Sequence, residues 1–89
     1  MARGIPKRVI DGDTFVLSNG QRVRPTGYNA PEKGQSGWLA AKNTLEDLVL
    51  GKTVGLGKTA NWDRGRNVRP VTVEGQPLEK LMRRHNKRR

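Results

Sequence analysis

The chain must hold its fold with a single small apolar core, because it offers few other means of stabilisation. It has 89 residues, of which 33% are hydrophobic, and its aromatic residues are Phe15, Tyr28, Trp38 and Trp62. It contains no cysteine, which excludes disulfides and thiolate zinc sites. A chain of this length buries only a modest share of its surface on folding. We therefore expect one small domain with a thin margin of stability, to which a bound ligand would add.

Positive charge is the second constraint. The net charge is +10, and the last 14 residues hold six of the 18 Lys and Arg residues but one of the eight acids. A basic surface attracts polyanions and speeds their capture, so we expect DNA or RNA as the partner of a monomeric protein. The alternative is a solvated basic face with a disordered tail. The chain has no apolar stretch of membrane-spanning length and few apolar residues in the tail, so we expect no membrane partner.

Alternating and apolar runs predict short strands separated by turns. The Asn19-Gly20 pair predicts a two-residue hairpin turn, since both residues tolerate positive φ. Pro25 lacks a backbone donor, so its strand should end, bulge or lie at a sheet edge there. Glu74-Gly75 predicts a further turn. The expected strands are residues 9–10, 14–17, 21–24, 52–56 and 68–73, with a polar loop at 57–67.

Helical periodicity is clearest from Ser36 to Leu50, where Ser36 can cap the start and Gly51 suits the left-handed position after the end. The apolar stripe of this helix is Trp38, Ala41, Leu45 and Leu48. A second, short helix is expected from Gln76 to about His85; its inward-facing residues are Leu78, Leu81 and Met82. We predict an α+β, mainly β domain at 1–84 and a disordered basic tail at 85–89, a pattern compatible with a small OB-type barrel.

Three polar segments carry the residue types that phosphodiester cleavage requires. The reaction needs cations around a phosphate that gains charge, and a group that orients or deprotonates water. The planar fork of arginine suits phosphate, and Ca²⁺ takes oxygen ligands. Taken singly, Asp11-Gly12-Asp13 is a turn, Arg24 is a solvent-facing strand residue and 63–66 is a polar loop.

The order and spacing of these segments resemble the thermonuclease (staphylococcal nuclease-like) family. The matching segments are Val9 to Thr14, Arg22 to Arg24, Asn29 to Glu32 and Asp63 to Arg66. The resemblance runs from about Val9 to Met82. It implies a five-stranded OB-type barrel with one long helix and one short C-terminal helix. It also implies a calcium-dependent endonuclease that hydrolyses DNA or RNA with little sequence preference.

The resemblance also implies roles for individual residues. The catalytic residues would be Arg24 and Arg66, which bind the scissile phosphate, and Glu32, which activates or positions the attacking water. The metal-binding residues would be Asp13, Asn29 and Ala30, with Asp11 in a supporting position. The residues expected to contact nucleic acid are Arg64, Lys33, Lys58 and Tyr28.

Three departures from the family pattern bear on activity. Asn29 stands where the family has its second metal-binding aspartate, so we expect weaker calcium binding. The segment before Arg66 is one residue shorter than usual, which leaves either Arg64 or Arg66 as the phosphate clamp. The chain ends after the short helix near Met82, without the family's final helix and its base-stacking tyrosines.

Two other functions stay open at this point. A domain of the same fold can be a catalytically weak or inactive nucleic-acid-binding module, and a basic structural protein also fits the composition. The retention of Arg24 and Glu32 favours the enzyme, because a binding module has no need of them. The segment from Met1 to Lys7 has no apolar stretch like that of a signal peptide. The location therefore stays open: the cytoplasm by default, or outside the cell if a signal was removed.

Overall fold

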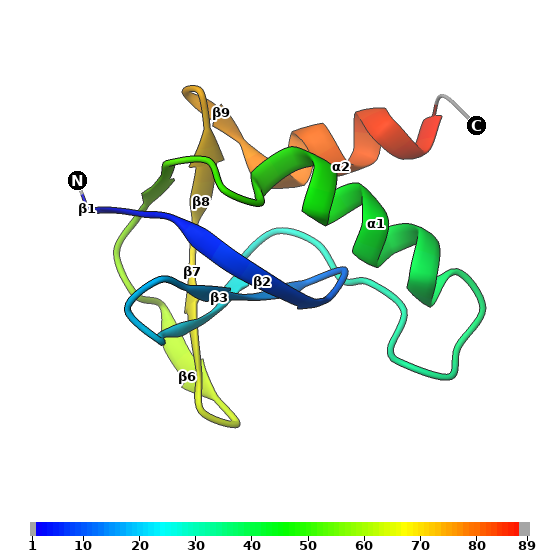
Figure 1. Cartoon of the computed structure of the whole chain (residues 1–89), viewed down its shortest axis with the longest axis horizontal. Helices are drawn as coiled ribbons and strands as arrows, with labels where there is room; N and C mark the ends of the chain where they lie inside the picture. The colour runs from blue at the N-terminus through cyan, green and yellow to red at the C-terminus, as the bar shows by residue number, and fades with distance from the viewer. Residues whose placement is uncertain (1, 88–89) are drawn as a thin grey trace.

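The computed structural model describes residues 2–87 (Figure 1), and its fold is α+β and mainly β, as the sequence predicts. Within this range no helix is both long enough and apolar enough to cross a membrane. The elements in chain order are β1 (Ala2–Gly4), β2 (Pro6–Asp11), β3 (Thr14–Leu17), β4 (Arg22–Pro25), α1 (Trp38–Val49), β5 (Val54–Leu56), β6 (Asn61–Asp63), β7 (Arg66–Arg69), β8 (Val71–Val73), β9 (Gln76–Pro77) and α2 (Leu78–Lys87).

The strands form two sheets. One has five strands in the order β2-β3-β4-β7-β6, and the other has four in the order β1-β5-β8-β9. The β4–β7 pair is parallel, and the other pairs are antiparallel. Between residues 2 and 87 the hydrogen-bonded strands do not close into one barrel. The strands are more numerous than the sequence predicts, because β1, β6 and β9 lie where no strand is expected, and β2 begins at Pro6, before its expected start at Val9.

Two prolines decide where strands end. Pro25 is the last residue of β4 and is fully buried, so the predicted end of this strand is confirmed. Pro70 divides the single strand predicted at 68–73 into β7 and β8, which belong to different sheets. Because Pro70 has no backbone N–H, it cannot continue a ladder on that side. Its carbonyl instead accepts a hydrogen bond from the backbone N–H of Gly57 (2.8 Å).

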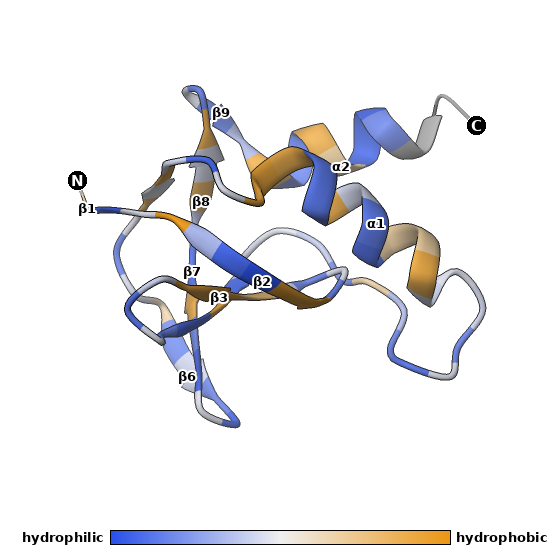
Figure 2. Ribbon diagram, in the orientation of Figure 1, coloured by the Kyte–Doolittle hydropathy of each residue, from blue (hydrophilic) through white to orange (hydrophobic). Residues whose placement is uncertain are grey.

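One apolar core joins both sheets to both helices. Figure 2 shows the apolar residues spread over short stretches of several strands and of α1 and α2. The predicted inward side of α2 is confirmed, because Leu78 and Met82 are buried and Leu81 packs against the core. The core residues are Val9, Phe15, Leu17, Val23, Leu45, Val49, Val54, Leu56, Val71, Val73, Leu78 and Met82.

Helix α1 differs from its prediction at its N-terminus. The N-cap is Gly37 (φ 86°) and not Ser36, and no side chain caps the helix. The buried face includes Thr44, Leu45 and Val49, so the apolar stripe is rotated relative to the predicted one. Trp38, predicted to be a core residue, lies outside the core. The Trp38 side chain is half-buried, and Lys33 Nζ and Lys42 Nζ each lie 5.9 Å from the centroid of its ring. This distance permits cation–π attraction, which a fully buried ring could not make with solvated lysines.

Two turns also differ from expectation. The β3–β4 connection contains a three-residue loop, Ser18-Asn19-Gly20, closed by the hydrogen bond from the Leu17 N–H to the Gln21 carbonyl (2.8 Å), rather than a two-residue turn. Gly20 alone takes positive φ (92°), and its N–H donates to the carbonyl of Leu17 (2.9 Å), which is the type I turn with a glycine bulge. The predicted loop at 57–67 contains β6 and the start of β7, joined by Arg64 (φ 52°) and Gly65 (φ 81°). Glu74-Gly75 forms the predicted turn.

The chain's C-terminal helix lies two residues further along the chain than predicted, because Gln76–Pro77 form strand β9 instead of the start of the helix. Helix α2 runs to Lys87, so residues 85–87 of the predicted basic tail are helical, and residues 88–89 lie outside the described part of the chain.

Candidate active site

One cavity of about 250 Å³ gathers residues from four separate segments of the chain. These segments are the β2–β3 turn, strand β4, the loop between β4 and α1, and the β6–β7 hairpin. The cavity is lined by Asp11, Asp13, Arg24, Glu32, Arg64 and Arg66. The sequence singled out all six, so the fold brings together residues that lie more than 50 positions apart.

The five-stranded sheet positions Asp11, Arg24 and Arg66 on one face. Asp11 pairs with Thr14 across β2 and β3, and Arg24 pairs with Val68 across β4 and β7. Directly paired residues point to the same side of a sheet. Arg66 lies two residues before Val68 in β7, so it shares that side. The two arginines therefore face the acidic turn from neighbouring parallel strands.

Gly12 holds the acidic turn against two other segments. Its carbonyl accepts a hydrogen bond from the Tyr28 hydroxyl (2.9 Å). A Cβ at this position would lie 2.6 Å from Ala41 Cβ in α1 and 2.7 Å from Ala30 Cβ in the β4–α1 loop. Glycine is therefore required here by close approach. Burial raises the pKa of the Tyr28 phenol above its ordinary value, and the nearby Asp13 carboxylate raises it further, so the hydroxyl stays a donor.

Asp13 is the centre of the hydrogen-bond network. It is 8% exposed, and its Oδ2 accepts a hydrogen bond from the Ala30 N–H (3.4 Å) and faces Arg24 Nη2 at 3.5 Å. The Thr14 hydroxyl donates to Asp13 Oδ1 (3.3 Å) and accepts from Arg66 Nη1 (3.0 Å). Thr14 thus links the carboxylate to the second arginine. Sequence reasoning missed this role, although strand alternation puts Thr14 on the same face as Arg24.

Arg66 and Arg64 differ in how firmly they are held. The Arg66 side chain is 19% exposed, and its Nη2 forms an ion pair with Asp63 Oδ2 (2.5 Å) in addition to its bond to Thr14. The Arg64 side chain is 82% exposed, and its Nε lies 4.0 Å from Asp63 Oδ1. Fixed donors stabilise developing charge better than mobile ones. Of the two arginines that the sequence leaves open as the phosphate clamp, Arg66 is therefore the one that the fold holds in place.

Two of the expected metal-binding residues, Asp13 and Asn29, supply oxygen atoms that converge. Arg24 Nη2 lies 2.6 Å from Asn29 Oδ1 and 3.5 Å from Asp13 Oδ2, so both oxygens already face one cationic group. Burial raises the pKa of the Asp11 carboxyl, and the neighbouring Asp13 carboxyl raises it further. Two close carboxylates and an amide oxygen fit a hard cation such as Ca²⁺. Within residues 2–87, however, no group of three or more Asp, Glu, His or Cys side chains is arranged to hold a metal.

Calcium affinity is expected to rise about tenfold on Asn29→Asp substitution, because ligand charge tunes calcium affinity and the present site has only two carboxylates. Isothermal titration calorimetry with calcium chloride measures the change. Asn19→Asp is the matched control: it adds the same charge in the β3–β4 loop, at the far end of β3 from Asp13. Equal calcium affinity in the wild type and Asn29→Asp variant would exclude position 29 as a ligand.

The remaining predicted residues lie elsewhere or have another contact. Tyr28 packs against the core and donates to Gly12, which leaves its ring less free to stack on a base. Lys58 lines a different cavity, with Arg69, and Lys33 lies beside the Trp38 ring. Glu32 is exposed in the β4–α1 loop, where its backbone N–H donates to Gln35 Oε1 (2.7 Å).

Trp62 in β6 is 62% exposed, but it does not line the candidate site. It pairs with Asn67, which is 3% exposed and lies on the core side of the sheet. The side chain of Trp62 therefore points away from the face that carries Asp63 and Arg66.

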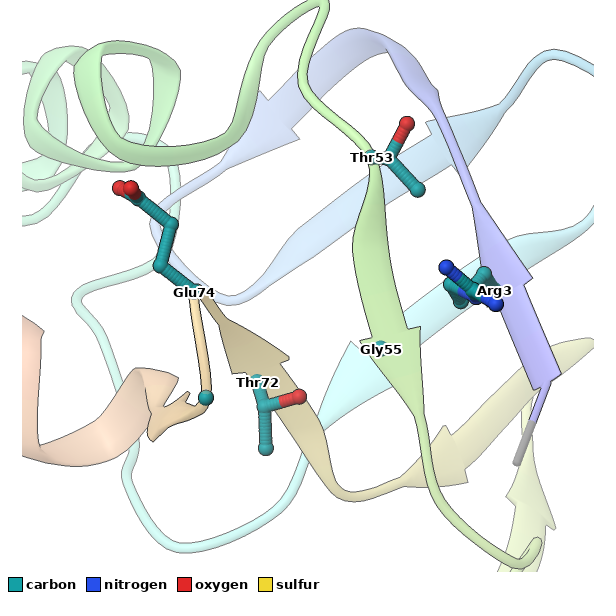
Figure 3. Close-up of a pocket in the computed structure, with 6 residues that line it drawn as sticks. Arg3, Thr53, Gly55, Thr72 and Glu74 are labelled. Atoms are coloured by element: carbon teal, nitrogen blue, oxygen red, sulfur yellow. The ribbon is translucent and has the colours of Figure 1, made fainter.

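A larger cavity, of about 440 Å³, lies on the four-stranded sheet. Figure 3 shows its lining, in which Arg3 and Glu74 flank Thr53, Gly55 and Thr72. It has one acid and one base and lacks the paired carboxylates and arginines of the smaller cavity. The smaller cavity is therefore the candidate site, because its side chains are the residue types that phosphodiester cleavage requires.

Comparison with known proteins does not assign the chain to a family. No protein-family model matches it, and no curated protein matches it. The functional proposal therefore depends on the residues of this chain and their geometry.

Proposed function

We propose that this protein is a calcium-dependent phosphodiesterase that hydrolyses DNA or RNA with little sequence preference. One observation carries the proposal: two carboxylates, three arginines and a further glutamate, drawn from four segments, line a single cavity. Such a set can bind a phosphate, hold a cation and activate water. The net charge of +10 supports a polyanionic substrate.

We also propose that the two sheets are the halves of an incompletely closed OB-type barrel. Three features support this: the two sheets share one core, β4 pairs with β7 in parallel, and α1 follows β4 as the resemblance implies. Folds of this type bind nucleic acids on a barrel face.

In this mechanism the arginines bind and the glutamate moves a proton. Arg24 and Arg66 donate hydrogen bonds to the non-bridging oxygens of the scissile phosphate. Arg66 is held for this role by Asp63 and Thr14. Glu32 takes a proton from the attacking water, whose oxygen bonds to phosphorus as the bond to the leaving oxygen breaks, and the leaving oxygen takes a proton from solvent water. Ca²⁺, held by Asp13, Asn29 and Asp11, would supply Lewis-acid stabilisation of the phosphate.

The second candidate is a nucleic-acid-binding module with weak or no catalysis. It is favoured by the ion pair between Arg24 and Asp13, because the guanidinium already compensates the carboxylate that a cation would use. Binding of the phosphate backbone needs only the basic residues and would be sensitive to salt.

Cleavage of single-stranded DNA, with calcium or with a chelator, distinguishes the two candidates. The wild type is expected to cut only with calcium, and Glu32→Ala to lower the rate by about 10²–10⁴-fold, the usual contribution of a general base. Asp47→Ala, which removes an exposed acid from α1, is the control and is expected to cut at the wild-type rate. DNA that is retained but never cut would reject the enzyme in favour of the binding module.

A further inference from the structure

A row of basic residues crosses the five-stranded sheet beside the candidate site. Arg8 in β2 pairs with Val16 in β3, and Val16 pairs with Arg22 in β4. Residues directly opposite one another in antiparallel strands point to the same side, so Arg8, Val16 and Arg22 share one face. Neighbouring strands lie about 4.8 Å apart, which places the two arginines on either side of Val16.

This face is opposite the core. The adjacent row, Val9, Phe15 and Val23, belongs to the core cluster. Val16 is 5% exposed yet is not part of that cluster. The burial of Val16 on the outer face is explained if the aliphatic parts of the Arg8 and Arg22 side chains cover it while their guanidinium groups stay in water.

The basic row lies on the same face as the candidate site. Arg22 and Arg24 are two residues apart in β4, so their side chains point the same way, with about 7 Å between them along the strand. Arg24 is the residue that faces Asp13 and Asn29. Arg22 is therefore the neighbour of Arg24 on this face of β4. From Arg22 the row runs across β3 to Arg8 in β2, away from Asp13 and Asn29.

The two outer arginines carry uncompensated charge. Arg24 and Arg66 form ion pairs with acids of the site, whereas Arg8 and Arg22 form none among residues 2–87. Both are exposed. A register shift between Pro6 and Arg8 leaves Lys7 as an extra, exposed residue of β2, which adds a third cation at this edge. In Figure 2 the middle of β2 is correspondingly hydrophilic.

We propose that Arg8 and Arg22 form a second phosphate subsite, which binds a backbone phosphate of the nucleic acid next to the one held by Arg24 and Arg66. This inference rests on the proposed function and extends it. A polyanion with regularly repeated phosphates can contact both sites, whereas an isolated phosphate fills only one. The subsite sets the direction in which the strand leaves the cavity, across β4 and β3 toward β2.

The test is the salt dependence of binding to a short single-stranded DNA, followed by fluorescence anisotropy with a chelator present to prevent cleavage. The double variant Arg8→Gln with Arg22→Gln is expected to make the slope of log K against log[salt] shallower by about 1.4, since each single-strand phosphate contact contributes about 0.7. The control pair, Arg3→Gln with Lys52→Gln, removes the same charge beside the other sheet and is expected to leave the slope unchanged.

Each outcome has a distinct meaning. Equal changes in both variants, or an unchanged slope in Arg8→Gln with Arg22→Gln, would overturn the subsite while leaving the proposed function standing. A wild type that does not bind DNA at low salt would overturn the proposed function and the subsite with it. Arg8→Lys with Arg22→Lys retains the charge and the cover over Val16, and is expected to keep the wild-type slope. Thermal melts of all variants check that the fold is intact.

Discussion

Arg66→Ala is expected to lower kcat for DNA cleavage by about 10²–10³-fold, the cost of removing one preorganised donor to a charge that develops in the transition state. Arg64→Ala, two residues away in the same hairpin, is expected to cost less than about tenfold. The difference follows from how the two side chains are held: Arg66 contacts both Asp63 and Thr14, whereas Arg64 is 82% exposed at the tip of the turn. Steady-state kinetics on single-stranded DNA measures both.

A substitution at Thr14 also tests whether the contacts that hold Arg66 contribute to kcat. Removal of its hydroxyl by Thr14→Val leaves Arg66 in place but takes away one of its two partners, so an intermediate loss of kcat is expected. A larger loss for Arg64→Ala than for Arg66→Ala would contradict this assignment. It would mean that the two-residue turn Arg64-Gly65 rearranges when substrate binds.

Gly12→Ala is expected to destabilise the domain by about 1–3 kcal/mol, the usual cost of overpacking. A methyl group there would lie 2.6 Å from Ala41 Cβ and 2.7 Å from Ala30 Cβ, and neither neighbour can rotate away. In a domain of this size each kcal/mol lowers the thermal midpoint by roughly 4–8 °C. Thermal denaturation followed by circular dichroism measures the shift. Calcium binding is expected to weaken too, since the turn carries Asp11 and Asp13.

A double-mutant cycle separates the steric cause from a general loss of stability. Ala41→Gly removes the atom closest to the new methyl group, so Gly12→Ala with Ala41→Gly should be more stable than the sum of the single changes predicts. Gly20→Ala is the comparison. Gly20 has positive φ (92°) and no atom within 4 Å of a Cβ, so it reports backbone strain without a clash. Strict additivity at positions 12 and 41 would reject the contact as the cause.

Local patterns predict the residues that line the smaller cavity because these patterns are short and chemically specific. The sequence Asp11-Gly12-Asp13 predicts a turn, and the spacing of Leu78, Leu81 and Met82 predicts the helix α2. The same local signals failed where a tertiary contact decided the outcome. Trp38 has the right spacing for a core residue, but the core includes Leu45 and Val49 of the same helix, and the Trp38 ring lies within cation–π distance of two lysines.

The sequence by itself determined the mainly β class, the positive charge and the identity of six residues that line the cavity, since composition and motif spacing belong to the chain alone. The tertiary structure decided how these residues meet. Only the parallel pairing of β4 with β7 puts Arg24 and Arg66 on the same face of neighbouring strands, and only the contact of α1 and the β4–α1 loop with Gly12 fixes the acidic turn. It also decided which arginine is held, because Arg66 and Thr14 are 52 residues apart and meet only when the sheet forms.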